Sequence, residues 1–178
     1  AGWPLGTSGE LQYTQKKNEA EQFVETIKHL GPGERQPPLQ LDYRVQDYRL
    51  QGALGNICEN GILILRYGKL RGKDLLTAWL HHSLALLQLG SAYQQTWLVT
   101  KEKVIQFNSE STGPGILRLL QIYSKGLRVP SQLYVEPAYV YGSQTFSRGK
   151  IEPRDKAESA LIDTVEKGYE PEWQLLLQ

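Results

Sequence analysis

The sequence predicts a single domain of mixed α and β structure, an α+β (α/β) fold whose elements follow the order α-β-β-β-α-β. Three observations support this prediction. A first segment has apolar residues every three or four positions, as an amphipathic helix does. The next segments alternate apolar and polar residues, which is typical of half-buried strands. Helical spacing then returns before another apolar run, and 178 residues are enough for one domain with a substantial core.

The first helix is expected over residues 14–30, where Phe23, Ile27 and Leu30 recur at helical spacing. The Gly-Pro-Gly sequence that follows Leu30 should end this helix, because glycine and proline both interrupt helical structure. Residues 1–13 show no such periodicity at their start, so we expect them to form a loop that enters the domain.

Three strands are expected next, over residues 39–45, 48–57 and 62–67. Gln46 and Asp47 separate the first two strands as a short turn. The Asn60-Gly61 pair predicts a hairpin between the second and third strands, because Asn-Gly favours the backbone conformation of tight turns. The third strand is apolar enough to be central. These segments predict an antiparallel meander.

A basic loop connects the meander to the second helix. Gly68 and Gly72 bracket this loop, and Asp74 stands where a carboxylate stabilises the amino-terminal end of a helix. Leucines and a tryptophan at helical spacing predict its buried face, and Gly90 should end it. The adjacent histidines within it point about 100° apart, so a structural role is expected rather than metal binding. A second hairpin is predicted over residues 97–107.

The carboxy-terminal third is predicted to contain a helix capped by Thr112 and ended by Gly126, a last strand over residues 133–135, and a polar helix over residues 154–165. An apolar tail follows, which we expect to dock on the body of the domain or on a partner. Its apolar residues are Trp173, Leu175, Leu176 and Leu177.

Composition limits the possible functions. Twenty basic and nineteen acidic residues give a net charge of +1, which is not the strongly basic balance of a free-standing DNA-binding domain. The single cysteine, Cys58, excludes an internal disulfide and suits a reducing cytosol. No signal peptide or membrane-spanning run is evident, so a cytoplasmic location and no membrane partner are expected. The absence of methionine indicates a segment of a longer protein.

The predicted order of elements is the core topology of the restriction-endonuclease-like (PD-(D/E)XK) nucleases. An active enzyme of this class holds one or two Mg²⁺ ions with an acid on the second strand and another on the third. A lysine two positions beyond the second acid helps to orient the attacking water. Mg²⁺ prefers such hard oxygen ligands, and its charge stabilises the phosphate during attack.

These catalytic residues are missing from the sequence. No Asp or Glu anywhere in the chain is followed two positions later by Lys. Gly55 stands at the position expected for the first acid, and the stretch Ile64-Leu65-Arg66-Tyr67-Gly68, with Arg66 and Tyr67 as its degenerate positions, stands where the second acid and the lysine belong. The nearest imitations of the motif, such as Asp42-Tyr43-Arg44 and Asp47-Tyr48-Arg49, have arginine in place of the lysine. Arginine does not release a proton near neutral pH, so it is a poor replacement for that lysine. We therefore predict a degenerate site with no catalytic residue, metal or cofactor.

Several segments resemble the carboxy-terminal domain of bacterial RecC. The chain reads LQGAL at 50–54, NGILILRY at 60–67 and LTAWLHHSL at 76–84. The RecC family has a Gly-Trp-Leu strand, an Asp-Gly strand rich in leucine that ends in Arg-Trp, and a helix with a Trp-Leu-Glu-His sequence. The spacing between the three blocks agrees, and His81 replaces the family's glutamate. The likeness extends over about residues 3–141 and weakens toward the tail.

This resemblance implies a non-catalytic scaffold within exodeoxyribonuclease V, a heterotrimer that unwinds and degrades DNA from double-strand breaks in bacteria. It implies RecB-type and RecD-type partner subunits, and DNA as a partner of the assembled complex. Residues 1–178 would form one domain, with the entry loop at 1–13, a nuclease-like core at 14–141, and a helix with the docking tail at 142–178.

The cations Arg66, Lys69, Arg71 and Lys73 are the candidate contacts to DNA or to a partner, because clustered cations bind phosphate in a salt-dependent way. The alternative is a solvated turn beside a helix. Two other functions also remain open. One is an active nuclease with a rearranged acid set drawn from Asp42, Asp47 and Glu59, and the other is an unrelated protein-interaction module.

Overall fold

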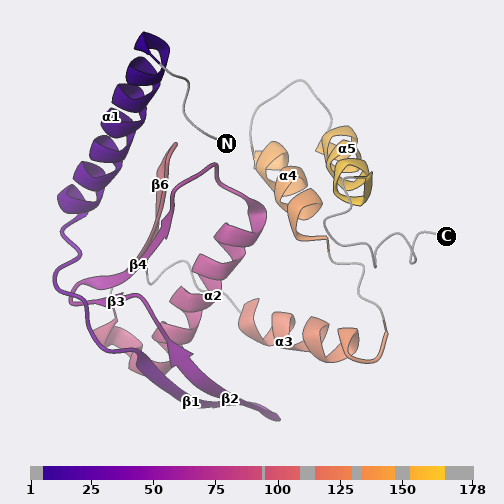
Figure 1. Cartoon of the computed structure of the whole chain (residues 1–178). Helices are drawn as coiled ribbons and strands as arrows, with labels where there is room; N and C mark the ends of the chain where they lie inside the picture. The colour runs from indigo at the N-terminus through magenta and orange to yellow at the C-terminus, as the bar shows by residue number, and fades with distance from the viewer. Residues whose placement is uncertain (1–5, 94, 109–114, 130–133, 147–152, 167–178) are drawn as a thin grey trace.

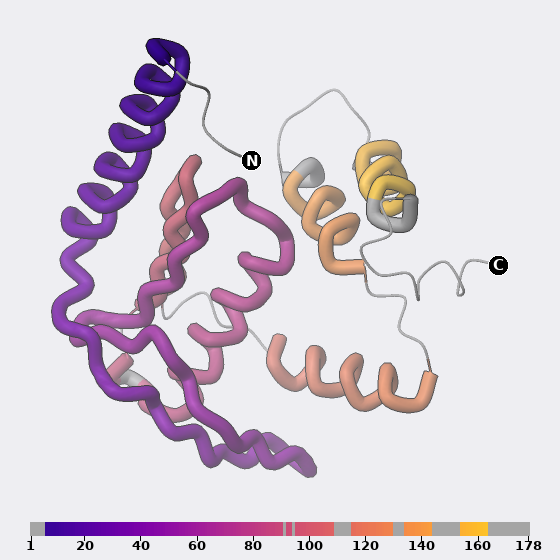
Figure 2. Tube along the Cα trace, viewed as in Figure 1, coloured from indigo at the N-terminus to yellow at the C-terminus, as the bar shows by residue number. Residues whose placement is uncertain are grey.

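A computed structural model describes residues 6–93, 95–108, 115–129, 134–146 and 153–166. Within these ranges the chain forms five α-helices, a short 3₁₀ helix and two β-sheets, so the mixed α and β class is confirmed. The elements are shown in Figure 1, and the path of the chain through them is followed in Figure 2. No helix in the described ranges has the length and apolar character needed to cross a bilayer.

The first helix, α1, spans Thr7–Leu30 and so begins seven residues earlier than predicted. The expected entry loop is therefore wrong from Thr7 onward, whereas residues 1–5 lie outside the described part of the chain. The predicted start was too late because a stripe of apolar residues marks the buried part of a helix, and a helix can extend beyond that part. The first half of α1 is exposed, with Leu11 68% accessible, and its glutamines and lysines favour a helix without any buried face. Its predicted end is confirmed at Gly31, which adopts φ 57°.

The first predicted hairpin is confirmed. Strands β1 (Leu39–Val45) and β2 (Tyr48–Leu54) pair antiparallel, and Val45 lies opposite Tyr48. Gln46 occupies the first turn position with φ 51°, which allows the tight two-residue connection. Along β1, half-buried and exposed residues alternate strictly, as the sequence pattern predicted.

The predicted three-stranded meander is wrong, because β1 and β2 form a sheet of their own. The alternation that continued to residue 57 is broken after Leu54, where Asn56 takes a left-handed backbone conformation of φ 60° and redirects the chain. A separate two-residue strand, β3 (Ile57–Cys58), then pairs antiparallel with β4 (Gly61–Arg66). The hairpin predicted at Asn60-Gly61 is confirmed, with Cys58 opposite Gly61.

The larger sheet has the strand order β3-β4-β5-β6. Strand β4 pairs parallel with β5 (Gln95–Thr100), and helix α2 (Gly72–Leu89) makes the crossover between them. The predicted second hairpin is confirmed by β5 and β6 (Val104–Asn108), which pair antiparallel. The general α-then-strands-then-α order is present, while a restriction-endonuclease-like core remains a prediction.

Helix α2 covers one face of this sheet and α1 lies at the other. Ile62 and Leu98 point toward α2 and are fully buried in clusters that include Ala78 and Ala85 of that helix. Just beyond the ends of β4 and β5, Tyr67 contacts Phe23 of α1 and Lys101 contacts Glu19 of α1. Helix α1 runs along the left of the sheet in Figure 1.

Three helices complete the described chain: α3 (Gly115–Gly126), α4 (Val135–Phe146) and α5 (Pro153–Glu166). The predicted ends of α3 at Gly126 and the polar helix near 154–165 are confirmed, whereas Thr112 lies outside the described residues. The strand predicted over 133–135 is wrong at Val135, which begins α4. Pro137 is tolerated there because the first helical turn leaves its N–H groups unbonded, so proline loses nothing.

Candidate nucleic-acid interface

The predicted basic loop leads from the end of β4 into α2. Its backbone is held by two hydrogen bonds, one of 2.8 Å from the Gly68 N–H to the Arg66 carbonyl and one of 3.2 Å from the Lys101 N–H to the Gly68 carbonyl. The loop is therefore tied to the turn between β5 and β6. Lys69, Arg71 and Lys73 are exposed, and no ion pair involves any of these three within the described ranges. We call these three residues the loop cations.

Arg66 differs from the loop cations, because it faces an acid. Its Nε lies 3.5 Å from Oδ2 of Asp74 in the first turn of α2, and both atoms are buried without a hydrogen-bond partner. The Asp74 side chain is only 17% exposed. This ion pair joins the end of β4 to the start of α2, so the Arg66 charge is partly neutralised inside the protein.

The three positions expected for a nuclease site are placed as follows. Gly55 lies between β2 and β3 rather than within a strand, and no heavy atom of the residues that the structure describes comes within 4 Å of the position a Cβ would take there. Arg66 ends β4 and faces α2, whereas Tyr67 follows it and meets Phe23 of α1 at a ring-centroid distance of 5.3 Å. The end of β4 thus presents a guanidinium and a phenol.

The three acids of the alternative hypothesis, an active nuclease with a rearranged acid set, are separated from one another. Asp42 accepts two hydrogen bonds from Arg49, of 2.9 and 2.7 Å, and this pairing lowers the pKa of Asp42. Glu59 instead accepts the Glu34 N–H at 3.1 Å. Across the residues that the structure describes, no group of three His, Cys, Asp or Glu side chains is arranged to hold a metal ion. Asp42, Asp47 and Glu59 are all among those residues, so they do not form one acid set.

The amino terminus of α2 already has an anionic partner. The Gly72 N–H donates a hydrogen bond of 2.7 Å to Oε2 of Glu136, which belongs to the first turn of α4. Gly72 is buried, and a Cβ there would lie 2.7 Å from Cβ of Tyr139 and 3.0 Å from the Val135 carbonyl oxygen. The Glu136 carboxylate therefore takes the place where a free anion would meet the helix dipole. Sequence reasoning missed Glu136 because it placed a strand here, although an acid before proline is typical of a first helical turn.

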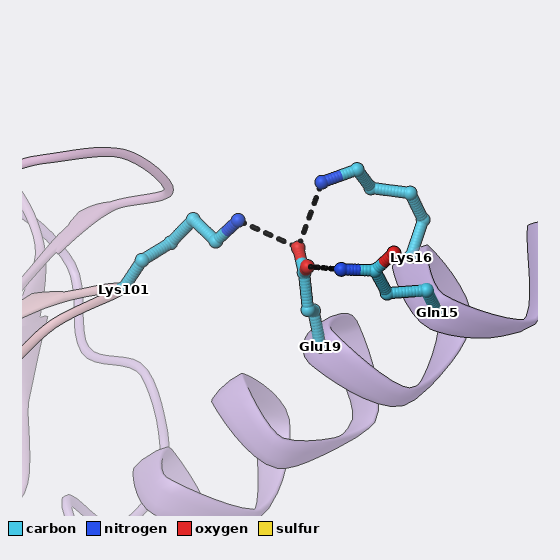
Figure 3. A network of polar contacts seen from close by, with 4 residues as sticks. All are labelled: Gln15, Lys16, Glu19 and Lys101. Carbon is cyan, nitrogen blue, oxygen red and sulfur yellow. Dashed lines mark hydrogen bonds and ion pairs between the residues drawn. The ribbon is translucent and has the colours of Figure 1, made fainter. Parts of the chain in front are cut away.

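A second charged network fixes α1 to the turn between β5 and β6 (Figure 3). Glu19 Oε2 lies 2.7 Å from Nζ of Lys101 and 3.0 Å from Nζ of Lys16, and Gln15 donates to the other carboxylate oxygen at 3.3 Å. The hydrogen bonds from the two lysines lower the pKa of Glu19 to about 2. Lys101 also lies 5.0 Å from the centroid of the Tyr67 ring. Lys101 is therefore engaged within the protein, unlike the loop cations.

Of the two adjacent histidines, His82 takes the expected structural role. His82 is fully buried, where its Nε2–H donates to the Asn108 carbonyl at 2.8 Å and its Nδ1 lies 3.2 Å from Thr96 Oγ1. Thr96 Oγ1 also bonds to the Tyr93 hydroxyl. Burial lowers the pKa of both His82 and His81, which favours neutral rings. This network joins α2 to β5 and β6 behind the loop.

The predicted docking tail, Trp173 with Leu175, Leu176 and Leu177, lies outside the described residues. Its docking therefore stays a prediction at this point.

Comparison with known proteins places the chain in a family. The family model for the RecC C-terminal domain matches residues 1–145, which include α1, both sheets, α2, α3 and most of α4. Comparison with curated proteins gave no match. RecC is a subunit of RecBCD, the exodeoxyribonuclease V of DNA repair and recombination. Because the matched residues make up far more than half of the chain, this protein belongs to the RecC C-terminal domain family.

Proposed function

We propose that this chain is a non-catalytic domain of a RecC subunit, which supports the assembly of a bacterial, cytoplasmic RecBCD complex and guides DNA strands within it. RecB-type and RecD-type subunits are its protein partners in this proposal. The loop cations contribute contacts to the DNA backbone, and no metal or cofactor takes part in its own role. Family membership supports the complex, and the site at the end of β4 supports the particular role.

One observation carries the proposal: positive charge gathers at the end of β4, where a nuclease of this class would bind its metal. The Arg66 guanidinium lies against Asp74, and the three loop cations are exposed beside them. Mg²⁺ binds through several carboxylate, carbonyl or water oxygens, and a neighbouring guanidinium repels it. The same arrangement attracts the phosphates of a nucleic acid.

The loop cations would meet phosphate through their side chains alone. The α2 amide that an anion would use at the helix terminus, the Gly72 N–H, is already bonded to Glu136. Contacts of this kind neutralise phosphates without reading base sequence. Each phosphate contact adds about 0.9 to the slope of log affinity against log salt concentration, so three loop cations account for a slope of at most about 2.7.

The test replaces Lys69, Arg71 and Lys73 together with alanine in the chain assembled with its cognate RecB and RecD subunits. We expect DNA affinity to fall and the magnitude of the salt slope to decrease by about 1 to 2.7. A control with the same loss of charge replaces Lys17, Lys28 and Arg44, which are exposed on α1 and β1. Equal affinity and slope in the loop variant and the unaltered complex would refute the role of the loop in binding DNA.

A magnesium-dependent nuclease assay on the purified chain tests the non-catalytic part of the proposal. We expect no cleavage of single- or double-stranded DNA above the background of a parallel preparation. Asp74 is the acid paired with Arg66 at the degenerate site, so Asp74→Asn is the diagnostic variant. Cleavage by the unaltered chain that disappears in Asp74→Asn would show a working acid and would reject the proposal.

A further inference from the structure

An apolar pocket of about 350 Å³ lies beside the basic loop, where α2, α3 and α4 meet. None of the described residues that line it carries a charge. The first two turns of α2 form one wall, and α3, β6 and the start of α4 form the others. Principal lining residues are Leu75, Trp79, Phe107, Leu119, Val135 and Ala138.

Two cations flank the rim of this pocket at Gly72, where the Glu136 carboxylate also lies with one oxygen bonded to the Gly72 N–H. Gly72 is a lining residue, and its two chain neighbours are Arg71 and Lys73. Both are exposed and lack an ion pair within the described ranges. An occupant that fits this site combines a large apolar anchor with acidic residues close to it in sequence, because the anchor fills the pocket while the acids meet the rim.

The sequence after α5 has this composition. It reads KGYEPEWQLLLQ over residues 167–178, so Glu170 and Glu172 stand just before Trp173, and three leucines follow. An indole buries a large apolar surface at a small cost in side-chain entropy, which makes it an effective anchor. Pro171 between the two acids favours an extended backbone that holds them beside the anchor.

The segment also starts within reach of the pocket. Helix α5 returns alongside α4 in the opposite direction, so its last turn lies near the first turn of α4 (Figure 1). Ala138 lines both the groove between α4 and α5 and the apolar pocket, which places the two sites on adjoining sides of α4. Trp173 lies seven positions after Glu166, and an extended chain spans up to about 23 Å over seven positions.

We propose that residues 167–178 dock intramolecularly on this pocket, with Trp173 as the anchor in the pocket and Glu170 and Glu172 against Arg71 and Lys73. The docked segment then covers the rim and lies directly beside Lys69. In the docked state Arg71 and Lys73 are paired with the segment, so the segment and phosphate compete for these two cations. The inference itself does not depend on DNA binding by the loop, and its tests use no DNA.

Hydrogen exchange measured by mass spectrometry on the full chain is the first test. The variant Trp173→Ser/Leu175→Ser/Leu176→Ser removes the anchor and two leucines. We expect amides in the first turns of α2 and α4 to exchange at least about tenfold faster in this variant, because a docked segment protects the helices it covers. Amides of β5 serve as an internal reference. The matched control is Ile162→Ser, an exposed apolar residue of α5 outside the pocket.

Disulfide trapping is the second test and identifies the occupant. In a Cys58→Ser background, Ala138→Cys is combined with Leu175→Cys, and Ser143→Cys with Leu175→Cys is the control pair. We expect oxidation at low protein concentration to close a bond within one chain for the first pair only. A bond that joins two chains would overturn the proposal in favour of a second copy. Unchanged exchange together with no bond would overturn it outright.

Discussion

The buried histidine network allows a stability prediction with a definite magnitude. His82→Ala removes the hydrogen bonds to Thr96 and to the Asn108 carbonyl, each worth about 1 kcal/mol. The ring centroids of Tyr93 and Phe107 lie 5.4 and 5.8 Å from that of His82. The substitution therefore also leaves a cavity beside these rings, which costs about 1 to 2 kcal/mol. The free energy of unfolding should fall by about 3 to 4 kcal/mol, which for a domain of this size lowers Tm by about 10 °C.

The same residue predicts how stability depends on pH. Burial lowers the pKa of His82, so the native ring stays neutral while the unfolded chain takes up a proton near pH 6.5. Stability is therefore complete above about pH 6.5 and decreases below it, until the lowered native pKa is reached. The slope due to this one group is at most about 1.4 kcal/mol per pH unit. A protonated ring would also have to donate from Nδ1, which reverses the bond from Thr96 and disturbs its bond with Tyr93.

Urea unfolding at pH 7.5, 6.0 and 5.0 measures both effects. His82→Gln keeps a donor and an acceptor but does not titrate, so it should lose part of the pH dependence while it remains more stable than His82→Ala. His81 has a pKa shifted in the same direction by burial, and it accounts for part of the remaining slope. His29→Gln, on the exposed end of α1, is the control. If His82→Gln and the unaltered protein lose stability equally between pH 7.5 and 5.0, the argument from a buried neutral ring is refuted.

Two further predictions concern the contacts on either side of the basic loop. Glu19→Gln should release the middle of α1 and speed its hydrogen exchange. The hydrogen bonds from Lys101 and Lys16 lower the pKa of Glu19 to about 2. In the unaltered chain the contact with Lys101 should therefore be fully present above about pH 4.5 and lost as pH falls toward 2. An α1 that exchanges at the same rate in Glu19→Gln and the unaltered chain would contradict this. Gly72→Ala should displace α4, because its Cβ would lie 2.7 Å from that of Tyr139, and should lower the free energy of unfolding by about 1 to 3 kcal/mol. Gly142→Ala in α4, whose Cβ would meet no atom of the described residues within 4 Å, should leave the position of α4 unchanged by comparison.

The sequence predicted those elements whose signals are local. The alternation in β1 and β2, the turn at Gln46 and the helical spacing of α2 all depend on near neighbours, and the structure contains each of them. The prediction of a three-stranded meander was wrong because the sequence pattern of a strand does not specify which strand it pairs with. At Asn56 a single left-handed residue turns the chain away, so β4 pairs with β5 and not with β2.

The errors near the site have a related cause. A strand was predicted over residues 133–135 because Val135 ends an apolar run in the sequence. In the structure, contacts of Glu136 and Tyr139 with Gly72 hold the segment that begins at Val135 as a helix. Arg66 and the three loop cations were predicted as a group from sequence proximity. Only the fold separates them, since Arg66 faces Asp74 of the next helix whereas Lys69 remains in solvent. A charge in a sequence becomes a binding site only when no nearby group has already neutralised it.

The parallel pairing at the centre of the larger sheet has a kinetic consequence. The hairpins close early, because Val45 meets Tyr48, Cys58 meets Gly61 and Val99 meets Val104 across only a few residues. Ile62 and Thr96 also pair, but the whole of α2 lies between them in the sequence, so this contact closes a much longer loop. Long-range closure carries a larger entropy cost and slows barrier crossing. We expect the rate-limiting event of folding to be the docking of the β5-β6 hairpin on β4, with α2 already helical, so that substitutions at Leu98 slow refolding more than substitutions in β1.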